Sequence, residues 1–282
     1  MPTHSVTQRG FVGDGGQTAT FLRLASGHHA EEWQRKQQNS ESQYHEQLSG
    51  LPERLQLIYQ LFDHYIAAAL WHAPGPRVLD VGCGISPAFP PYAGSLERLH
   101  ATGRMIYTGL DPLDANVETR KYPFIHGRLE DLPGRLRERF DVFVFSTSLD
   151  HFEDVGRAAA DVRKLASSGA IAIFWVGLHD SQYVAELMGS DLFGRYFQSG
   201  SSGRLLSGTL QLLCRIPVMA WRLAVRQRRL ASKAPLDELH FHYFTAETLP
   251  EALAQFGTVT DVTRLPGSNS VFATVAVSPA GS

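Results

Sequence analysis

Short apolar segments alternate with amphipathic segments through the middle of the chain. Five runs of mostly apolar residues have the length of buried strands, and they cover residues 77–81, 105–110, 122–126, 142–146 and 170–176. Between the last two runs, residues 155–166 repeat apolar positions every three or four residues, which predicts a helix. Strands that alternate with helical connections predict an α/β fold built on a doubly wound, mostly parallel sheet.

The N-terminal part of the chain precedes this alternation and has helical patterns. An apolar face recurs at spacings of three and four over residues 55–70, which predicts a helix. Residues 30–50 are mostly polar and predict another helix, with Trp33 and Tyr44 as its main apolar anchors. Residues 1–30 are rich in Gly, Ser, Thr and His without clear periodicity, so we expect a loose arm there.

A basic insertion follows the last of the buried runs. Residues 180–239 have a helical and loop-like composition, and no acidic residue occurs from position 192 to position 236. Arginines and one lysine are interleaved there with leucines and other apolar residues. Pro217 is expected to interrupt any single long helix within this insertion.

The C-terminal segment returns to the α/β pattern. A helix is predicted over residues 246–256, and strands are predicted over residues 258–265 and 271–277, on either side of a Pro-Gly turn. We expect an N-terminal arm with a helical cap, a core, a helical lid insertion, and a C-terminal helix and strand pair that completes the core. These four regions cover residues 1–72, 73–179, 180–239 and 240–282.

Composition excludes several classes of protein. Hydrophobic residues make up 43% of the chain and charged residues 19%, which argues against disorder and for a sizeable buried core. The chain has 26 Lys and Arg residues and 28 Asp and Glu residues. It therefore lacks the clear basic excess of proteins whose main function is to bind nucleic acid. Two cysteines, Cys83 and Cys214, do not make a disulfide framework. No segment resembles a signal peptide or a membrane span, so we expect a cytoplasmic protein.

The residues that follow the first buried run carry the strongest chemical signal. The string Asp80-Val81-Gly82-Cys83-Gly84 contains two glycines, which allow backbone conformations closed to other residues and let a ligand approach the main chain. A dinucleotide loop needs a third Gly or Ala at position 87, but this position is Pro87. An acid just before the glycines suits a cationic or amine-bearing ligand better than a pyrophosphate. A purely structural turn is the alternative.

This string resembles the first motif of the class I S-adenosylmethionine-dependent methyltransferases, which has the form apolar-Leu-Asp-apolar-Gly-Cys-Gly. The resemblance extends in motif order over residues 77–177 and implies a Rossmann-like methyltransferase fold with a seven-stranded sheet. It implies that Asp80 lies near the amino end of the cofactor. It also implies that the backbone of Gly82, Cys83 and Gly84 passes against the cofactor.

The remaining cofactor contacts are implied by motifs that follow in the family's order. Asp111 ends the second strand, beside Pro112, and a carboxylate there can accept hydrogen bonds from both ribose hydroxyls. Leu129 and Glu130 lie in the segment that lines the adenine in the family. Ser146 ends the fourth strand and is expected to face the methyl-bearing end of the cofactor.

Histidines dominate the candidates for catalysis and acceptor binding. The string Leu149-Asp150-His151-Phe152 resembles the family's Leu-acid-His signature, so His151 is a candidate base because histidine titrates near neutral pH. A histidine that only packs and stabilises the loop is the alternative. His179 follows the fifth strand, at the edge where this architecture places substrate-facing residues. The candidate acceptor contacts are Tyr44, His240, His242 and Tyr243.

The pair His240 and His242 also suggests a metal site, because alternate residues of a strand share a face. No cysteine or carboxylate pair nearby completes a tetrahedral site, so no metal ligand is assigned and pocket histidines are favoured.

The leading hypothesis is transfer of a methyl group from S-adenosylmethionine to an oxygen or nitrogen atom of a small molecule. The transfer would be an in-line displacement with S-adenosylhomocysteine as the product. One alternative places residues 204–229 on a membrane surface, where the enzyme would reach a lipid-like acceptor. Another is a binding module that holds the cofactor without turnover. The net charge argues against nucleic acid as the acceptor, and the sequence leaves the oligomeric state open.

Overall fold

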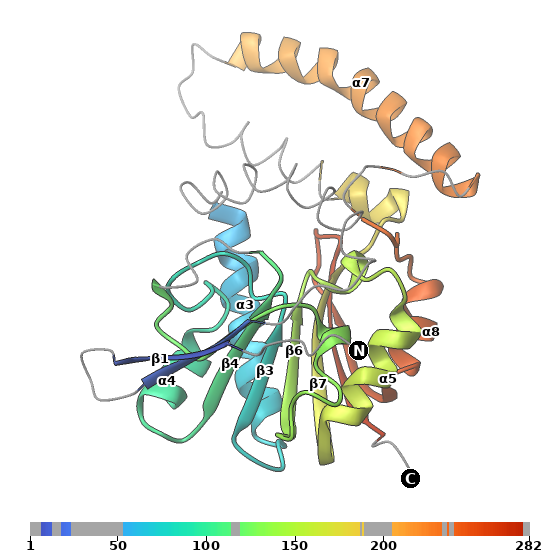
Figure 1. The fold of residues 1–282 in the computed structure, drawn as a ribbon. Coiled ribbons are helices and arrows are strands. Elements are labelled where there is room, and N and C mark those ends of the chain that lie inside the picture. Colours follow the sequence, from blue (N-terminus) through green and yellow to red (C-terminus); the bar gives the residue numbers. More distant parts are fainter. Residues whose placement is uncertain are drawn as a thin grey trace.

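The computed structural model describes residues 7–12, 18–23, 53–113, 119–186, 188, 205–232, 236 and 240–278. Within this part of the chain the strands form one nine-stranded sheet, in the order β1-β2-β5-β4-β3-β6-β7-β9-β8 (Figure 1).

Parallel strands make the centre of the sheet. They are β3 (Arg77–Val81), β4 (Ile106–Asp111), β5 (Phe124–His126), β6 (Phe140–Ser146) and β7 (Ala166–Gly177). The order of the strands reverses at β3, because β4 lies on one side of it and β6 on the other. The carboxyl ends of these neighbouring strands therefore form one edge, where an open α/β sheet binds its ligands.

An antiparallel pair completes the sheet beside β7. β9 (Ser270–Val277) runs antiparallel to β7, and β8 (Gly257–Arg264) pairs with β9 at the outer edge. The seven strands from β5 to β8 confirm the predicted doubly wound, mostly parallel sheet.

Two further strands extend the sheet beyond the seven that were predicted. β1 (Thr7–Val12) and β2 (Thr18–Arg23) form an antiparallel pair, and β2 runs parallel to β5. The expectation of a loose arm was wrong for these two segments. A short strand that adds to a free sheet edge is held by main-chain hydrogen bonds to its neighbour. It therefore needs no regular alternation of apolar and polar residues, and the sequence pattern does not reveal it.

Helices cover both faces of the sheet (Figure 1). On one face lie α3 (Glu53–Leu70) and α4 (Gly94–Ala101), and on the other lie α5 (Val155–Leu165) and α8 (Thr248–Ala254). Phe62 and Ile66 are fully buried, which confirms the apolar face predicted for this helix. The predicted helix over residues 30–50 lies outside the described residues.

The helix α7 (Leu205–Ala231) belongs to the insertion and lies beyond the edge where the parallel strands end (Figure 1). It continues through Pro217, so the expected interruption was wrong. A proline removes one backbone donor and kinks a helix, but the strong helix formers around it (Leu, Met, Ala, Arg and Gln) sustain helical geometry on both sides. None of the described helices combines the length and the apolarity that a membrane crossing needs.

Candidate active site

A cavity opens where β3, β4 and β6 end. Its walls are the glycine loop after β3, the end of β4 with the residues that follow it, the 3-10 helix η2 (Leu129–Asp131), and the segment after β6. Of the predicted cofactor residues, those that line it are Gly82, Gly84, Asp111, Pro112, Leu129, Glu130 and Ser146. His151 lines it as well.

The two glycines of the loop have left-handed backbone conformations, with φ of 79° at Gly82 and 77° at Gly84. A side chain at Gly82 is excluded by packing, because an added Cβ would lie 2.6 Å from Cβ of Ser148. At Gly84 an added Cβ would meet no atom within 4 Å. Gly84 therefore presents bare backbone to open space beside the cavity, as the close approach of a ligand requires.

Asp111 holds the loop and also faces the cavity. Its Oδ2 accepts a hydrogen bond of 2.8 Å from the backbone N–H of Gly84, and its Oδ1 accepts one of 2.8 Å from that of Leu113. Burial raises the pKa of the Asp111 carboxyl, and these two backbone donors act in the opposite direction. Each carboxylate oxygen can accept a second bond, so this side chain can still bind a ligand's hydroxyl groups.

Asp80 lies behind the loop and does not line the cavity, in contrast to the prediction. The hydroxyls of Tyr107 and Tyr92 donate to its Oδ2 at 2.5 and 3.0 Å. Burial raises the pKa of Asp80 to about 7, against these hydrogen bonds, which lower it. The reason for its position is strand alternation: Val81 lines the cavity, so the side chain before it points into the opposite layer.

Cys83 also lies outside the cavity lining. Its side chain is buried, and burial raises the pKa of its thiol. Its backbone N–H donates to the carbonyl of Leu110 at 3.2 Å, so this residue ties the loop to the end of β4 through the main chain.

Arg120 supports the glycine loop from beneath, and the sequence analysis missed it. Its Nη2 donates to the carbonyl of Gly84 at 2.7 Å, and its Nη1 donates to that of Ser86 at 2.9 Å. The guanidinium lies 4.0 Å from the ring centre of Phe124, as in a cation–π contact. No local pattern marks this arginine, since the carbonyls it binds lie far away in the sequence.

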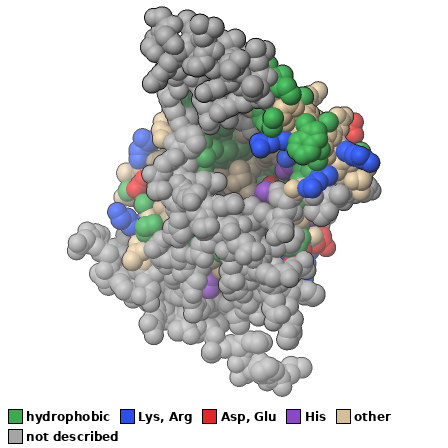
Figure 2. Space-filling model, turned by 90° about the horizontal axis from the view of Figure 1, so that it is seen from above, with side chains coloured by type: hydrophobic (Ala, Val, Ile, Leu, Met, Phe, Trp, Pro, Cys, Tyr) green, Lys and Arg blue, Asp and Glu red, His purple; other side chains and the backbone are tan. Residues whose placement is uncertain are grey.

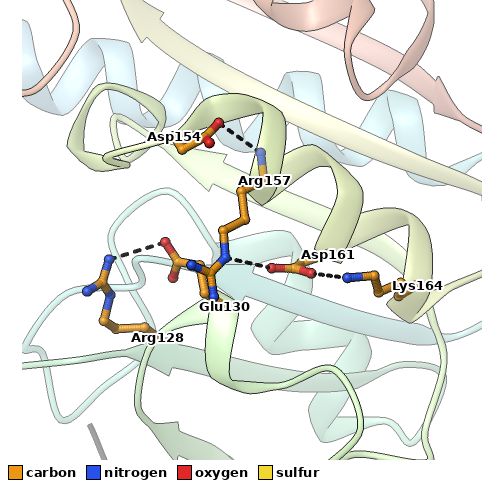
Figure 3. Close-up of polar contacts among 6 residues, drawn as sticks. All are labelled: Arg128, Glu130, Asp154, Arg157, Asp161 and Lys164. Carbon is orange, nitrogen blue, oxygen red and sulfur yellow. Dashed lines mark hydrogen bonds and ion pairs between the residues drawn. The ribbon is translucent and has the colours of Figure 1, made fainter. Parts of the chain in front are cut away.

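Ion pairs shape the wall around η2. Arg128 Nη2 lies 3.3 Å from Oε1 of Glu130, so the carboxylate next to the cavity is partly neutralised (Figure 3). The neighbouring α5 is capped by Asp154, whose side chain accepts from the backbone N–H of Arg157 at 3.0 Å (Figure 3).

The segment after β6 forms another part of the cavity wall. Thr147 has a φ of 52°, which is unusual for a β-branched residue, and its N–H donates to the carbonyl of Trp175 at 2.9 Å. The hydroxyl of Ser148 donates to the carbonyl of Val81 at 2.6 Å and so joins this segment to the glycine loop. Both residues line the cavity, and neither was predicted.

Four of the predicted catalytic and acceptor-binding residues come together beside this segment. The ring centres of His151 and His240 lie 4.8 Å apart, and those of His179 and Tyr243 lie 5.2 Å apart. His179 and His240 are also neighbours, with ring centres 5.9 Å apart. His179 is buried and does not line the cavity.

Of the two other predicted acceptor contacts, the structure describes His242 alone. The ring of His242 stacks on that of Phe244, with ring centres 5.9 Å apart. Tyr44 lies outside the described residues.

Comparison with known proteins identifies the family. A family model described as a methyltransferase domain matches residues 53–260, which is most of the chain. No curated protein matches the chain in sequence.

Solved structures share the fold. One is the 1,6-didemethyltoxoflavin-N1-methyltransferase of Burkholderia thailandensis, crystallised with 1,6-didemethyltoxoflavin and S-adenosylhomocysteine. It has a TM-score of 0.53 and 16% identity, over 90% of this chain and 92% of that one. Another is the plantazolicin methyltransferase BamL, in complex with a triazolic desmethylPZN analogue and S-adenosylhomocysteine. It has a TM-score of 0.50 and 12% identity, over 87% of this chain and 92% of that one.

The family match argues against the binding module without turnover that the sequence left open. With its doubly wound sheet and its glycine loop at the end of β3, the chain belongs to the methyltransferase family, as a class I enzyme whose methyl donor is S-adenosylmethionine.

Proposed function

We propose that the protein methylates a small molecule on an oxygen or nitrogen atom. One observation carries the proposal: the bare backbone of Gly84 and the carboxylate of Asp111 face one cavity, and His151 lines the same cavity. The two structures described above each hold an organic molecule together with S-adenosylhomocysteine, which supports a small-molecule acceptor.

The residues of the cavity fit S-adenosylmethionine. Asp111 would accept hydrogen bonds from the ribose hydroxyls, and Leu129 and Glu130 would contact the adenine. Because Gly84 has no side chain, the space beside its left-handed backbone is open to the cofactor. When bound, this cofactor supplies an electrophilic methyl group on a positively charged sulfur. Asp80 acts from behind the loop, by holding Tyr92 and Tyr107 in place.

Alignment of the acceptor is the main catalytic contribution of this chain. An in-line displacement needs the acceptor atom opposite the sulfur, and correct positioning alone can supply about 7–11 kcal/mol. Ser146 and Thr147 bound the space near the methyl group. His151 lies beside them and takes the proton of a hydroxyl acceptor, with Asp150 next to it at 3.7 Å.

We propose that residues 180–239 act as a lid over the acceptor side. Arg226 on α7 donates from Nε to the carbonyl of His179 at 3.5 Å, so this helix reaches the edge at which the histidines gather. We retain residues 1–72, 73–179, 180–239 and 240–282 as the proposed division into an N-terminal region, cofactor-binding core, lid and C-terminal part of the core, although β1 and β2 of the N-terminal region add to the sheet of the core.

A lipid-like acceptor is the second candidate, and the surface of α7 favours it. Trp221 is 67% exposed and Val218 is 50% exposed. Arg222 and Arg229 of the same helix are exposed as well, so α7 carries both apolar and basic side chains on its surface (Figure 2). Such a surface binds anionic membranes through both its apolar and its basic side chains.

Two measurements test the proposed function. Calorimetric titration of the full chain with S-adenosylhomocysteine is expected to show one site, and absence of heat on folded protein would refute the cofactor site. Release of S-adenosylhomocysteine from S-adenosylmethionine is then measured with phenols, hydroxy acids and amines, each with and without anionic vesicles. Turnover that depends on vesicles would favour the lipid-like acceptor over the small molecule.

A further inference from the structure

Two imidazoles and one carboxylate converge at the edge where β6 and β7 end. The 3-10 helix η3 (Leu149–His151) supplies Asp150 and His151, and the segment before α8 supplies His240. One ligand atom from each of the three residues lies within 4.8 Å of the other two. The two oxygens of Asp150 are shared, since Nε2 of His151 lies 3.7 Å from Oδ1 and Nε2 of His240 lies 3.5 Å from Oδ2.

The backbone holds this cluster in place. The N–H groups of Phe241 and His242 both donate to the carbonyl of Asp150, at 2.9 and 3.2 Å, so the segment that carries His240 is fixed to η3. The edges of His179 and Tyr243 pack on the ring of His240, with ring centres 5.9 and 6.1 Å away. The three side chains therefore reach their positions through tertiary contacts that do not depend on a ligand.

The side chains of the cluster are largely buried. The side chain of Asp150 is 8% exposed, that of His151 15% and that of His240 22%. Because His151 also lines the cavity, the cluster adjoins the space assigned to the methyl donor and the acceptor.

Two imidazoles with one carboxylate are the protein ligands of several catalytic metal sites, which keep further positions open for a substrate. In a tetrahedral zinc site the ligand atoms lie about 3.4 Å apart, as bond lengths near 2.1 Å require. The separations of 3.5 and 3.7 Å to Asp150 are close to this value. An Asp–His pair that acts as a general base would need only one imidazole, whereas here each carboxylate oxygen of Asp150 has an imidazole beside it.

We propose that Asp150, His151 and His240 bind one divalent transition-metal ion of the zinc, iron or manganese class at the wall of the methyl-donor cavity. The sequence had suggested a metal at His240 and His242 but offered no carboxylate. The structure provides one from η3, and it turns His242 away toward Phe244.

The role of the ion rests on the proposed function with one change, because His151 then binds the ion and does not act as the base. An acceptor with a hydroxyl group binds an open position of the ion through its oxygen and releases its proton to solvent. This oxygen then forms a bond to the methyl carbon as the sulfur–methyl bond breaks, and the electron pair of that bond stays on sulfur. The proposal thus narrows the acceptor to molecules with a metal-binding oxygen atom.

The test uses the full chain without a histidine tag. The protein is treated with EDTA, dialysed, and titrated with Co²⁺, which reports its ligands through visible absorption and heat. The expected result is one Co²⁺ per chain. His240→Ala and Asp150→Asn are expected to weaken Co²⁺ binding by more than about 100-fold. Loss of a residue that only hydrogen-bonds to a metal ligand typically weakens metal binding by about 10- to 100-fold.

His72→Ala is the matched control, because this exposed histidine lies just before β3, at the opposite edge of the sheet. It is expected to bind Co²⁺ as the unaltered chain does. Absence of Co²⁺ binding by the unaltered chain would overturn the proposal whether or not the variants fold, and would leave an Asp–His pair that handles protons. Equal losses in His240→Ala and His72→Ala would overturn it as well.

A parallel titration with S-adenosylhomocysteine separates the two proposals. Binding of this compound without binding of Co²⁺ refutes the metal site alone. Binding of Co²⁺ without binding of S-adenosylhomocysteine refutes the assignment of the cofactor cavity and leaves the metal site supported.

Discussion

Gly84 offers a direct test of where the cofactor lies. Gly84→Ala places a methyl group on a backbone with φ of 77°, in space where no atom lies within 4 Å. The left-handed conformation costs about 1–2 kcal/mol for a residue with a Cβ, and no clash adds to this in the free protein. With the cofactor bound, the methyl group overpacks the contact. Overpacking typically costs about 1–3 kcal/mol, so the affinity for S-adenosylhomocysteine should fall about 5- to 150-fold.

Gly103→Ala provides a matched control for the backbone cost. Gly103 has φ of 69°, an added Cβ there meets no atom within 4 Å, and it does not line the cavity. Both variants should lose similar stability in urea unfolding, whereas only Gly84→Ala should lose affinity in calorimetry. Unchanged affinity in Gly84→Ala would refute the idea that the cofactor passes against this residue. Equal affinity losses in both variants would instead indicate a general effect of destabilisation.

Three further predictions concern the site and the lid. Asp111→Ala should weaken calorimetric binding of S-adenosylhomocysteine by about 1.5–3 kcal/mol, through loss of hydrogen bonds to a charged group, and unchanged affinity would remove the ribose assignment. Asp80 has a pKa of about 7 in the folded protein, against 3.8 as the ordinary value. The folded state thus binds more protons between these values, so stability should fall by up to about 1.4 kcal/mol per pH unit as the pH rises, and level off above about pH 7. Asp80→Asn should remove this decline. The check is the urea midpoint of each protein, measured across this pH range. If the midpoints of the unaltered chain and of Asp80→Asn changed with pH in the same way, the raised pKa of Asp80 would be refuted. Trp221→Ser should reduce co-sedimentation with anionic vesicles if α7 meets a membrane, whereas no vesicle binding by the unaltered chain would exclude the lipid-like acceptor.

The sequence was sufficient for features that depend on neighbouring residues. Buried parallel strands are apolar along their whole length, so runs such as residues 77–81 and 142–146 identified β3 and β6 without other information. The glycine loop was equally visible, because its two left-handed residues must be glycines wherever a chain makes this turn. Asp111 could be found because it lies in fixed register with the end of its strand.

Only the tertiary structure decided features that depend on a partner far away in the sequence. β2 forms a strand because β5 offers it an edge, and Arg120 matters because it reaches the carbonyls of the glycine loop. Strand alternation turns Asp80 from the cavity, but only the fold brings the hydroxyls of Tyr92 and Tyr107 to its buried carboxyl. Asp150 and His240 meet because backbone hydrogen bonds bring their two segments together. Periodicity reports which side of an element is buried, but it does not report what lies against that side, and the chemistry of this edge depends on those contacts.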